Sequence, residues 1–93
     1  MSSIEFTLHG KKRASQRCIR QEAIAFALEN GLKIHRQGRI FHVVLSRDLS
    51  SPQQDRFRDV VVLTDLNWKV ITTYKNRHAI SKIERASKIN RAA

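Results

Sequence analysis

A histidine and two arginines recur every four residues near the start of the chain. His9, Arg13 and Arg17 stand at positions i, i+4 and i+8 of the segment FTLHGKKRASQR. Residues four apart lie on one face of an α-helix, and the row drifts by only about 40° per step. All three side chains can therefore line one groove. His9 would also lie near the helix N-terminus, where unpaired N–H groups favour an anion.

These residue types suit cleavage of RNA without a metal ion. A general base removes the proton of a 2′-hydroxyl, whose oxygen attacks the adjacent phosphorus, and a general acid protonates the leaving 5′-oxygen. Imidazole titrates near neutral pH, so His9 can act as base or acid. Arg13 and Arg17 would stabilise the charge on the phosphate. The same spacing also occurs on solvated basic helices, and that interpretation stays open.

Two helices should position these residues. Residues 4–7 can form a short first strand, and residues 9–17 form a mostly polar helix. Residues 21–30 form a clearer amphipathic helix, because their apolar positions recur at helical spacing. Gly31 suits the left-handed position just past its end.

From Lys33 onward the hydrophobic period changes to two. The segment KIHRQGRIFHVVLS predicts a hairpin that turns at Gln37 and Gly38. This register places Arg36 opposite Arg39, where like charges repel unless an anion bridges them. The face expected to pack against the helices carries Ile34, Phe41, Val43 and Leu45.

Two more strands, DVVVLT and KVITTYK, follow a polar loop and are joined by a four-residue turn. Such short connections make a mainly antiparallel sheet. We therefore predict an α+β fold, with two N-terminal helices packed on one face of a strongly twisted sheet of four to five strands. The other face would be partly open. Val70, Thr72 and Tyr74 share one side of the last strand. The hydroxyls of Thr72 and Tyr74 could assist catalysis, although both residues are also ordinary strand formers.

The charge of the chain points to a polyanionic partner. Its 93 residues, enough for one domain, carry 18 Lys and Arg against eight Asp and Glu, a net charge of +10. This excess favours RNA, DNA, a ribosome or an acidic protein as partner. Cys18 is the single cysteine and cannot form a disulfide within the chain, which favours a reducing compartment. No apolar run approaches the roughly 20 residues that a membrane helix needs. We therefore expect a cytoplasmic protein.

A basic amphipathic segment ends the sequence. Apolar residues and basic residues each recur every three positions there. This pattern predicts a single domain at residues 1–78 and a basic helix or tail at 79–93. The residues expected to bind RNA phosphates are Lys11, Lys12, Arg77, Lys82, Arg85 and Lys88.

The motif order resembles a small family of uncharacterised bacterial domains. The matching features are the pattern His9-x-x-x-Arg13-x-x-x-Arg17-x-Ile19, an amphipathic helix and the closing strand KVITTYKN, over roughly residues 4–76. That family resembles an outlying branch of the barnase–EndoU–colicin–RelE-like superfamily, which includes many RNA-cleaving toxins. The resemblance implies a RelE/barnase-like domain with its site between the first helix and the open sheet face, and an acidic antitoxin as a possible partner.

Three residues depart from the family pattern. Gly10 replaces an alanine, Cys18 stands where a glycine often ends the first helix, and Arg20 stands where a serine cap is usual. Gly10 matters most for chemistry, because glycine is unfavourable inside a helix and so leaves the direction of His9 open.

Sequence and resemblance together favour a toxin-like, metal-independent endoribonuclease that needs no cofactor. A non-enzymatic RNA- or ribosome-binding module on the same scaffold is the alternative, because no second well-placed general acid is found. His42 is a weak second candidate for proton transfer. The other ligands that a metal site would need do not accompany it in the sequence. A helix-turn-helix that reads duplex DNA is disfavoured, since that motif normally sits in a three-helix core.

Overall fold

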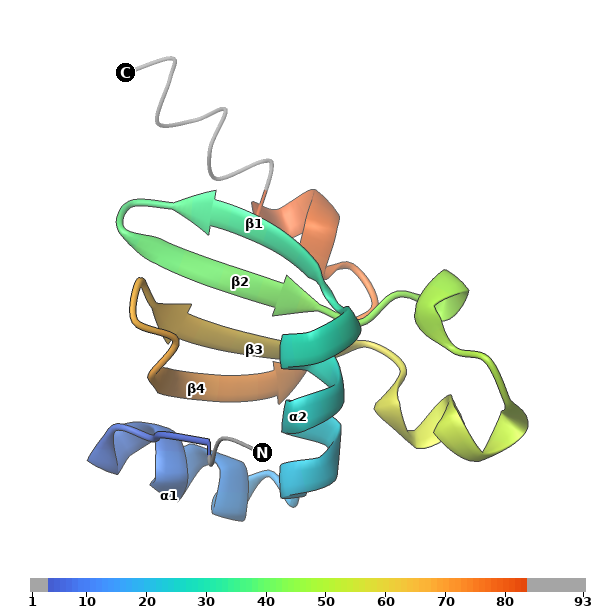
Figure 1. The fold of residues 1–93 in the computed structure, drawn as a ribbon, viewed down its shortest axis with the longest axis horizontal. Helices are drawn as coiled ribbons and strands as arrows, with labels where there is room; N and C mark the ends of the chain where they lie inside the picture. The colour runs from blue at the N-terminus through green and yellow to red at the C-terminus, as the bar shows by residue number, and fades with distance from the viewer. Residues whose placement is uncertain (1–3, 84–93) are drawn as a thin grey trace.

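The computed structural model describes residues 4–83 and shows an α+β fold within that range (Figure 1). The strands form one sheet in the order β1-β2-β3-β4, and every neighbouring pair is antiparallel. The predicted fold class and strand direction are thus confirmed. The elements are α1 (Leu8–Gln16), α2 (Gln21–Asn30), β1 (Leu32–Arg36), β2 (Arg39–Val43), the 3-10 helices η1 (Ser46–Asp48) and η2 (Pro52–Phe57), β3 (Val60–Asp65) and β4 (Val70–Lys75).

The β1–β2 hairpin turns where the sequence predicts. Gln37 and Gly38 both have positive φ, 52° and 75°, as a two-residue turn matched to strand twist requires. The register pairs Ile34 with Phe41, and it places Arg36 directly opposite Arg39. The predicted register is confirmed, including its pair of like charges.

The sheet buries apolar side chains on both faces, and the sequence prediction assigned them to the wrong sides. Val44, Val60, Val62 and Val70 pack with the helices, in a cluster that includes Ile24 of α2. The set predicted to meet the helices lies on the opposite face. There Val43 is buried in a second cluster, against which Ile34, Phe41 and Leu45 pack. The pattern misled because β3 is apolar at successive positions, so alternation does not identify the helix side.

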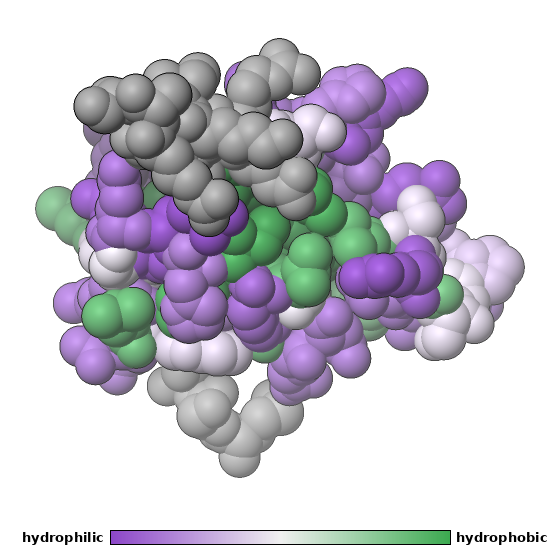
Figure 2. Space-filling view, turned by 90° about the horizontal axis from the view of Figure 1, so that it is seen from above, coloured by the Kyte–Doolittle hydropathy of each residue, from purple (hydrophilic) through white to green (hydrophobic). Residues whose placement is uncertain are grey.

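A helical segment at residues 79–83 covers part of that second face. Ala79 and Ile83 are buried there against Val43 and Val61. The start of the predicted C-terminal helix therefore belongs to the core. Viewed from above, the described part of the molecule shows an apolar area flanked by hydrophilic side chains (Figure 2).

The two predicted helices pack differently. α2 packs mainly on β3, with some contact to β2, whereas α1 lies along β4, the last strand of the sheet (Figure 1). The predicted first strand is reduced to a single parallel bridge between Phe6 and Val70. Val70 N–H donates to the Glu5 carbonyl and its carbonyl accepts from Thr7 N–H, both at 2.8 Å. The chain then turns into α1, whose N-cap is Thr7.

Gly10 explains how α1 approaches β4 so closely. It is a buried residue of α1, and a Cβ added to it would overlap the Val70 carbonyl oxygen and lie 3.1 Å from the carbonyl oxygen of Ile71. Thr7 Oγ1 accepts a hydrogen bond from Gly10 N–H at 2.9 Å, which fixes the first turn. Glycine lowers the stability of a helix by about 1 kcal/mol relative to alanine. Its lack of a side chain, however, lets α1 pack directly on the backbone of β4.

The helix ends are unusual. Cys18 takes the left-handed conformation after α1 (φ 55°), a position that glycine normally fills. The prediction that Gly31 is left-handed is wrong, because its φ is −69°. Gly31 is required for space instead, since a Cβ would lie 2.6 Å from the Ala27 carbonyl oxygen. Lys33 of β1 reaches back to donate to the carbonyls of Ala27 and Leu28, at 3.0 and 2.7 Å.

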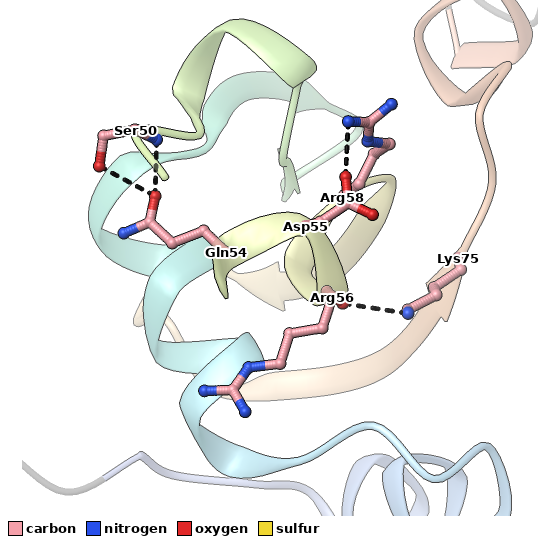
Figure 3. Close-up of polar contacts among 6 residues, drawn as sticks. All are labelled: Ser50, Gln54, Asp55, Arg56, Arg58 and Lys75. Atoms are coloured by element: carbon pink, nitrogen blue, oxygen red, sulfur yellow. Dashed lines mark hydrogen bonds and ion pairs between the residues drawn. The ribbon is translucent and has the colours of Figure 1, made fainter. Parts of the chain in front are cut away.

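The segment between β2 and β3 is tied to the end of β4. Lys75 Nζ donates to the Arg56 carbonyl of η2 at 3.1 Å (Figure 3). An ion pair between Arg58 and Asp55 closes the end of η2. None of the helices in residues 4–83 is long and apolar enough to cross a membrane.

The close approach of α1 and β4 makes a prediction about Gly10. Gly10→Ala should destabilise the protein by roughly 1–3 kcal/mol, although alanine is the better helix former, because its methyl group overlaps the Val70 carbonyl. Urea denaturation measures the change. Ser15→Ala, on an exposed position of the same helix, is the matched control and should be neutral or slightly stabilising. A Gly10→Ala variant as stable as Ser15→Ala would contradict the docking.

Candidate functional site

An open groove of about 830 Å³ lies between α1 and the adjoining part of the sheet. It contains all five residues that the sequence nominated for catalysis. Its lining consists of His9, Arg13, Arg17, Ile19, Arg39, Leu63, Ile71, Thr72, Tyr74, Lys75, Asn76 and Lys82.

The i, i+4 row of α1 forms one wall. Arg13 Nε donates to His9 Nε2 at 3.1 Å, so Nε2 is an acceptor in this arrangement and the ring proton is assigned to Nδ1. His9 is exposed. In this tautomer the Nε2 lone pair is the one that a general base would use, and Arg13 occupies it.

Arg17 is fixed from the sheet side. Its NH1 atom donates to the Thr73 carbonyl at 2.7 Å and more weakly to Thr72 Oγ1 at 3.4 Å. A guanidinium carries five N–H donors, so donors remain for a phosphate. This backbone anchor restricts the long side chain and reduces the entropy lost when an anion binds.

A β-bulge determines which β4 side chains face the groove. Thr72 pairs with Leu63 and Tyr74 with Val61, but Val70 pairs with Thr64 because the register shifts between Leu63 and Thr64. Val70 consequently joins the helix-side core. Thr72 and Tyr74 stay on the opposite face and line the groove. The sequence prediction placed Val70 on their face, and the bulge is the reason that it is not there.

Burial raises the pKa of the Tyr74 phenol, while the nearby Arg17 guanidinium partly opposes that shift. Tyr74 therefore stays protonated at neutral pH and remains a hydrogen-bond donor. Its hydroxyl and that of Thr72 add neutral polar groups to a cationic groove.

The electrostatics of the groove are one-sided. Its lining holds five cationic side chains and, among residues 4–83, no carboxylate. Two ion pairs form within that part of the chain, Arg56–Glu22 and Arg58–Asp55, and both use residues outside the groove. The cations that line the groove are Arg13, Arg17, Arg39, Lys75 and Lys82. An anionic ligand would meet attraction along the whole groove.

The residues predicted to bind RNA separate into three groups. Lys82 lines the groove, at the base of the C-terminal segment. Lys11, Lys12 and Arg77 are exposed but do not line it. The other two, Arg85 and Lys88, lie outside the described residues.

The sequence analysis missed three polar residues that line the groove, namely Arg39, Lys75 and Asn76. Arg39 could have been found from the hairpin register. Strand alternation puts Arg39 on the same face as Phe41, and Phe41 pairs with Leu63, the partner of Thr72. The β2–β3 register needed for this step depends on tertiary structure.

His42 is corrected by the structure. It is fully buried, and its register partners place it on the helix side of the sheet, away from Thr72 and Tyr74. Its Nε2 hydrogen-bonds Thr64 Oγ1 at 2.8 Å, and the ring packs edge-on against Trp68 at 4.7 Å. His42 therefore has no access to the groove, and the suggestion that it transfers protons there is wrong.

Burial, reinforced by the positive charge of Lys33 and by His35, lowers the pKa of His42 to about 4. Its Nδ1 has no hydrogen-bond partner among residues 4–83. The ring is thus a neutral core residue at physiological pH. Within residues 4–83, no group of three His, Cys, Asp or Glu side chains is placed to hold a metal ion.

Comparison with protein-family models, with curated proteins and with solved structures finds no significant match to this chain.

The buried imidazole predicts a pH dependence of stability. The pKa of His42 is about 4 in the folded protein and about 6.5 in an unfolded chain, so the unfolded state takes up the proton first. The free energy of unfolding should fall by about 2–3 kcal/mol between pH 7.5 and 4.5 through this residue. Urea denaturation across that range measures it.

The double variant His42→Leu/Thr64→Val replaces the buried polar pair by apolar groups and should lose most of this pH dependence. His78→Gln, at an exposed position and not among the groups that shift the pKa of His42, is the control and should keep it. Equal pH dependence in wild type and double variant would show that His42 is not the responsible group.

Proposed function

We propose that the groove binds single-stranded RNA and cleaves it by attack of the 2′-hydroxyl on the adjacent phosphate. The observation that carries this proposal is the convergence, in one groove, of His9, five cations and two hydroxyl groups, without a carboxylate among the described lining residues. The activity agrees with the one that the resemblance implied. The single-sided charge favours a phosphodiester backbone over a neutral substrate.

In the proposed reaction, His9 Nε2 accepts the 2′-hydroxyl proton. The O2′–P bond forms as the P–O5′ bond breaks, which leaves a 2′,3′-cyclic phosphate and a 5′-hydroxyl. Arg13 now occupies Nε2 at 3.1 Å, so it must turn toward the phosphate when RNA binds. That movement would free the base and add a donor to the phosphorane oxygens.

Arg17 would hold the scissile phosphate. Its anchor on the Thr73 carbonyl points a charged donor at a fixed place, which is how arginine stabilises charge that develops in a transition state. Thr72, next to that anchor, would contribute a hydroxyl donor.

Tyr74 is the residue in the groove that would return a proton to the leaving 5′-oxygen. Its raised pKa keeps the phenol protonated, and a leaving alkoxide is a stronger base than a phenolate. Proton transfer from Tyr74 would therefore be favourable once the P–O5′ bond begins to break.

A second function, RNA binding without cleavage, is favoured by one observation. The groove lining contains one histidine among residues 4–83, and Arg13 occupies its Nε2. In this alternative, His9 positions Arg13, and the arginines hold the backbone. The partners proposed for either function are RNA and RNA-bearing particles such as ribosomes.

The test of the leading proposal is cleavage of a labelled single-stranded RNA by the purified full-length protein in EDTA. We expect products with 2′,3′-cyclic phosphate ends, and no cleavage of the same sequence carrying 2′-O-methyl groups. His9→Gln should lower the rate by about 10²-fold or more and leave RNA affinity within about twofold, because the Arg13 and Arg17 charges remain. His78→Gln, at an exposed position outside the groove lining, should retain full activity.

The outcomes of these assays distinguish the two proposed functions. Cleavage that survives His9→Gln would reject the proposed mechanism. Absence of cleavage, together with salt-sensitive binding that Arg13→Gln and Arg17→Gln weaken, would establish the binding module. Absence of any RNA binding by the wild type would reject both.

The role of Tyr74 predicts a chemical rescue. Tyr74→Phe should slow cleavage of ordinary RNA by about 10²-fold. It should have little effect on an RNA whose 5′-oxygen at the scissile bond is replaced by sulfur, because a thiolate leaves without protonation. His9→Gln should slow both substrates. If Tyr74→Phe slows both substrates equally, Tyr74 binds the phosphate and does not act as the general acid.

A further inference from the structure

The tip of the β1–β2 hairpin holds two arginines directly opposite each other. Arg36 and Arg39 are the last pair before the Gln37–Gly38 turn. Side chains in such a pair have Cβ atoms about 5 Å apart, and like charges at that distance destabilise a sheet. The free protein therefore carries a repulsion that another residue pair at this position would avoid.

No carboxylate in residues 4–83 forms an ion pair with this pair of arginines. Asp65 lies across from Arg39 on β3 and keeps its negative charge, but the two side chains form no ion pair. The Oδ1 atom of Asp65 instead accepts hydrogen bonds from the N–H groups of Asn67 and Lys69. Arg36 NH1 donates to the carbonyl of His35, and its buried Nε has no partner among the described residues.

Arg39 is also part of the groove. Phe41 of β2 pairs with Leu63 of β3, which pairs with Thr72 of β4. Arg39 is two residues from Phe41 along β2, so it lies two strands across from Thr72 and two residues away along the strand direction. Standard strand spacing makes this a separation of about 12 Å. One phosphate held at Arg17 beside Thr72 is too far away to reach the hairpin pair, whereas the next part of the same backbone can.

We propose that Arg36 and Arg39 form a second phosphate subsite, which binds the RNA backbone beyond the scissile phosphate. The proposal rests on the proposed RNA binding in the groove and specifies its substrate as a chain of several nucleotides. A phosphate between the two guanidinium groups accepts charge-assisted hydrogen bonds from both. It also removes their mutual repulsion, so the pair is disfavoured in the free protein and favoured in the complex.

The test compares two uncleavable ligands, a 2′-O-methyl dinucleotide and a 2′-O-methyl hexanucleotide, titrated into the full chain by NMR. We expect Arg39→Gln and Arg36→Gln each to weaken hexanucleotide binding by about tenfold and to leave dinucleotide binding unchanged. The slope of log K against log salt for the hexanucleotide should fall by about 0.7 for each lost phosphate contact.

Arg47→Gln is the matched control, because Arg47 is exposed on η1 and does not line the groove. It removes the same charge and reports the nonspecific effect of lower net charge. A second measurement, thermal melting at low salt without RNA, should show Arg36→Gln melting a few degrees above wild type, since it relieves the repulsion.

The outcomes separate this subsite from the function on which it rests. If Arg17→Gln weakens both ligands while Arg39→Gln behaves like Arg47→Gln, RNA binding in the groove stands and the subsite is rejected. If Arg36→Gln lowers the melting temperature without changing binding, Arg36 is structural and the subsite is also rejected. If wild type binds neither ligand, both proposals fall.

Discussion

The groove depends on one constraint, the pair of backbone hydrogen bonds that joins the segment before α1 to Val70 of β4. Both backbone polar groups of Val70 are used by this segment, the N–H by the Glu5 carbonyl and the carbonyl by Thr7 N–H. Thr7 then caps α1, and Gly10 lets the helix approach the same carbonyl. Because the helix is fixed at its first turn, the direction of the whole i, i+4 row is set by backbone contacts rather than by the basic side chains themselves. A longer side chain at position 10 would move α1 outward, and the row with it.

The distribution of charge separates the cations that pair with carboxylates from those that gather in the groove. Arg56 and Arg58 pair with carboxylates around η2, and Lys33 neutralises the carbonyl end of α2. The five cations of the groove form no ion pair among the described residues, although Arg17 and Lys75 each donate to a backbone carbonyl. A group of like charges lowers the stability of the free domain, and this cost supports the proposal that the groove binds an anion. Solubility alone would be served by charges spread over the surface.

Local structure could be predicted from the sequence better than the face of the sheet that packs against the helices. The α2 boundaries, the Gln37–Gly38 turn and the Arg36–Arg39 register follow from periodicity and turn chemistry, which act over a few residues. The side of the sheet that meets the helices did not follow, because Val60 to Leu63 are all buried. The row of His9, Arg13 and Arg17 was found from spacing, and Thr72 and Tyr74 from alternation and the resemblance. Arg39 was not found, because its place in the groove requires the β2–β3 register.

The bulge between β3 and β4 allows one short strand to serve both the core and the groove. In a regular ladder, Val70, Thr72 and Tyr74 would share a face, and Val70 would be exposed to the groove. The shift at Leu63 and Thr64 rotates Val70 into the helix-side core. There the backbone of Val70 holds the N-terminal segment, while Thr72 and Tyr74 keep their hydroxyls on the open face. An irregularity in pairing next to a polar groove is typical of bulges that direct side chains toward a site. Val70, whose backbone anchors the segment leading into α1, thus has its side chain in the core and not in the groove. The groove can therefore be lined by polar side chains while the contacts that support it are buried.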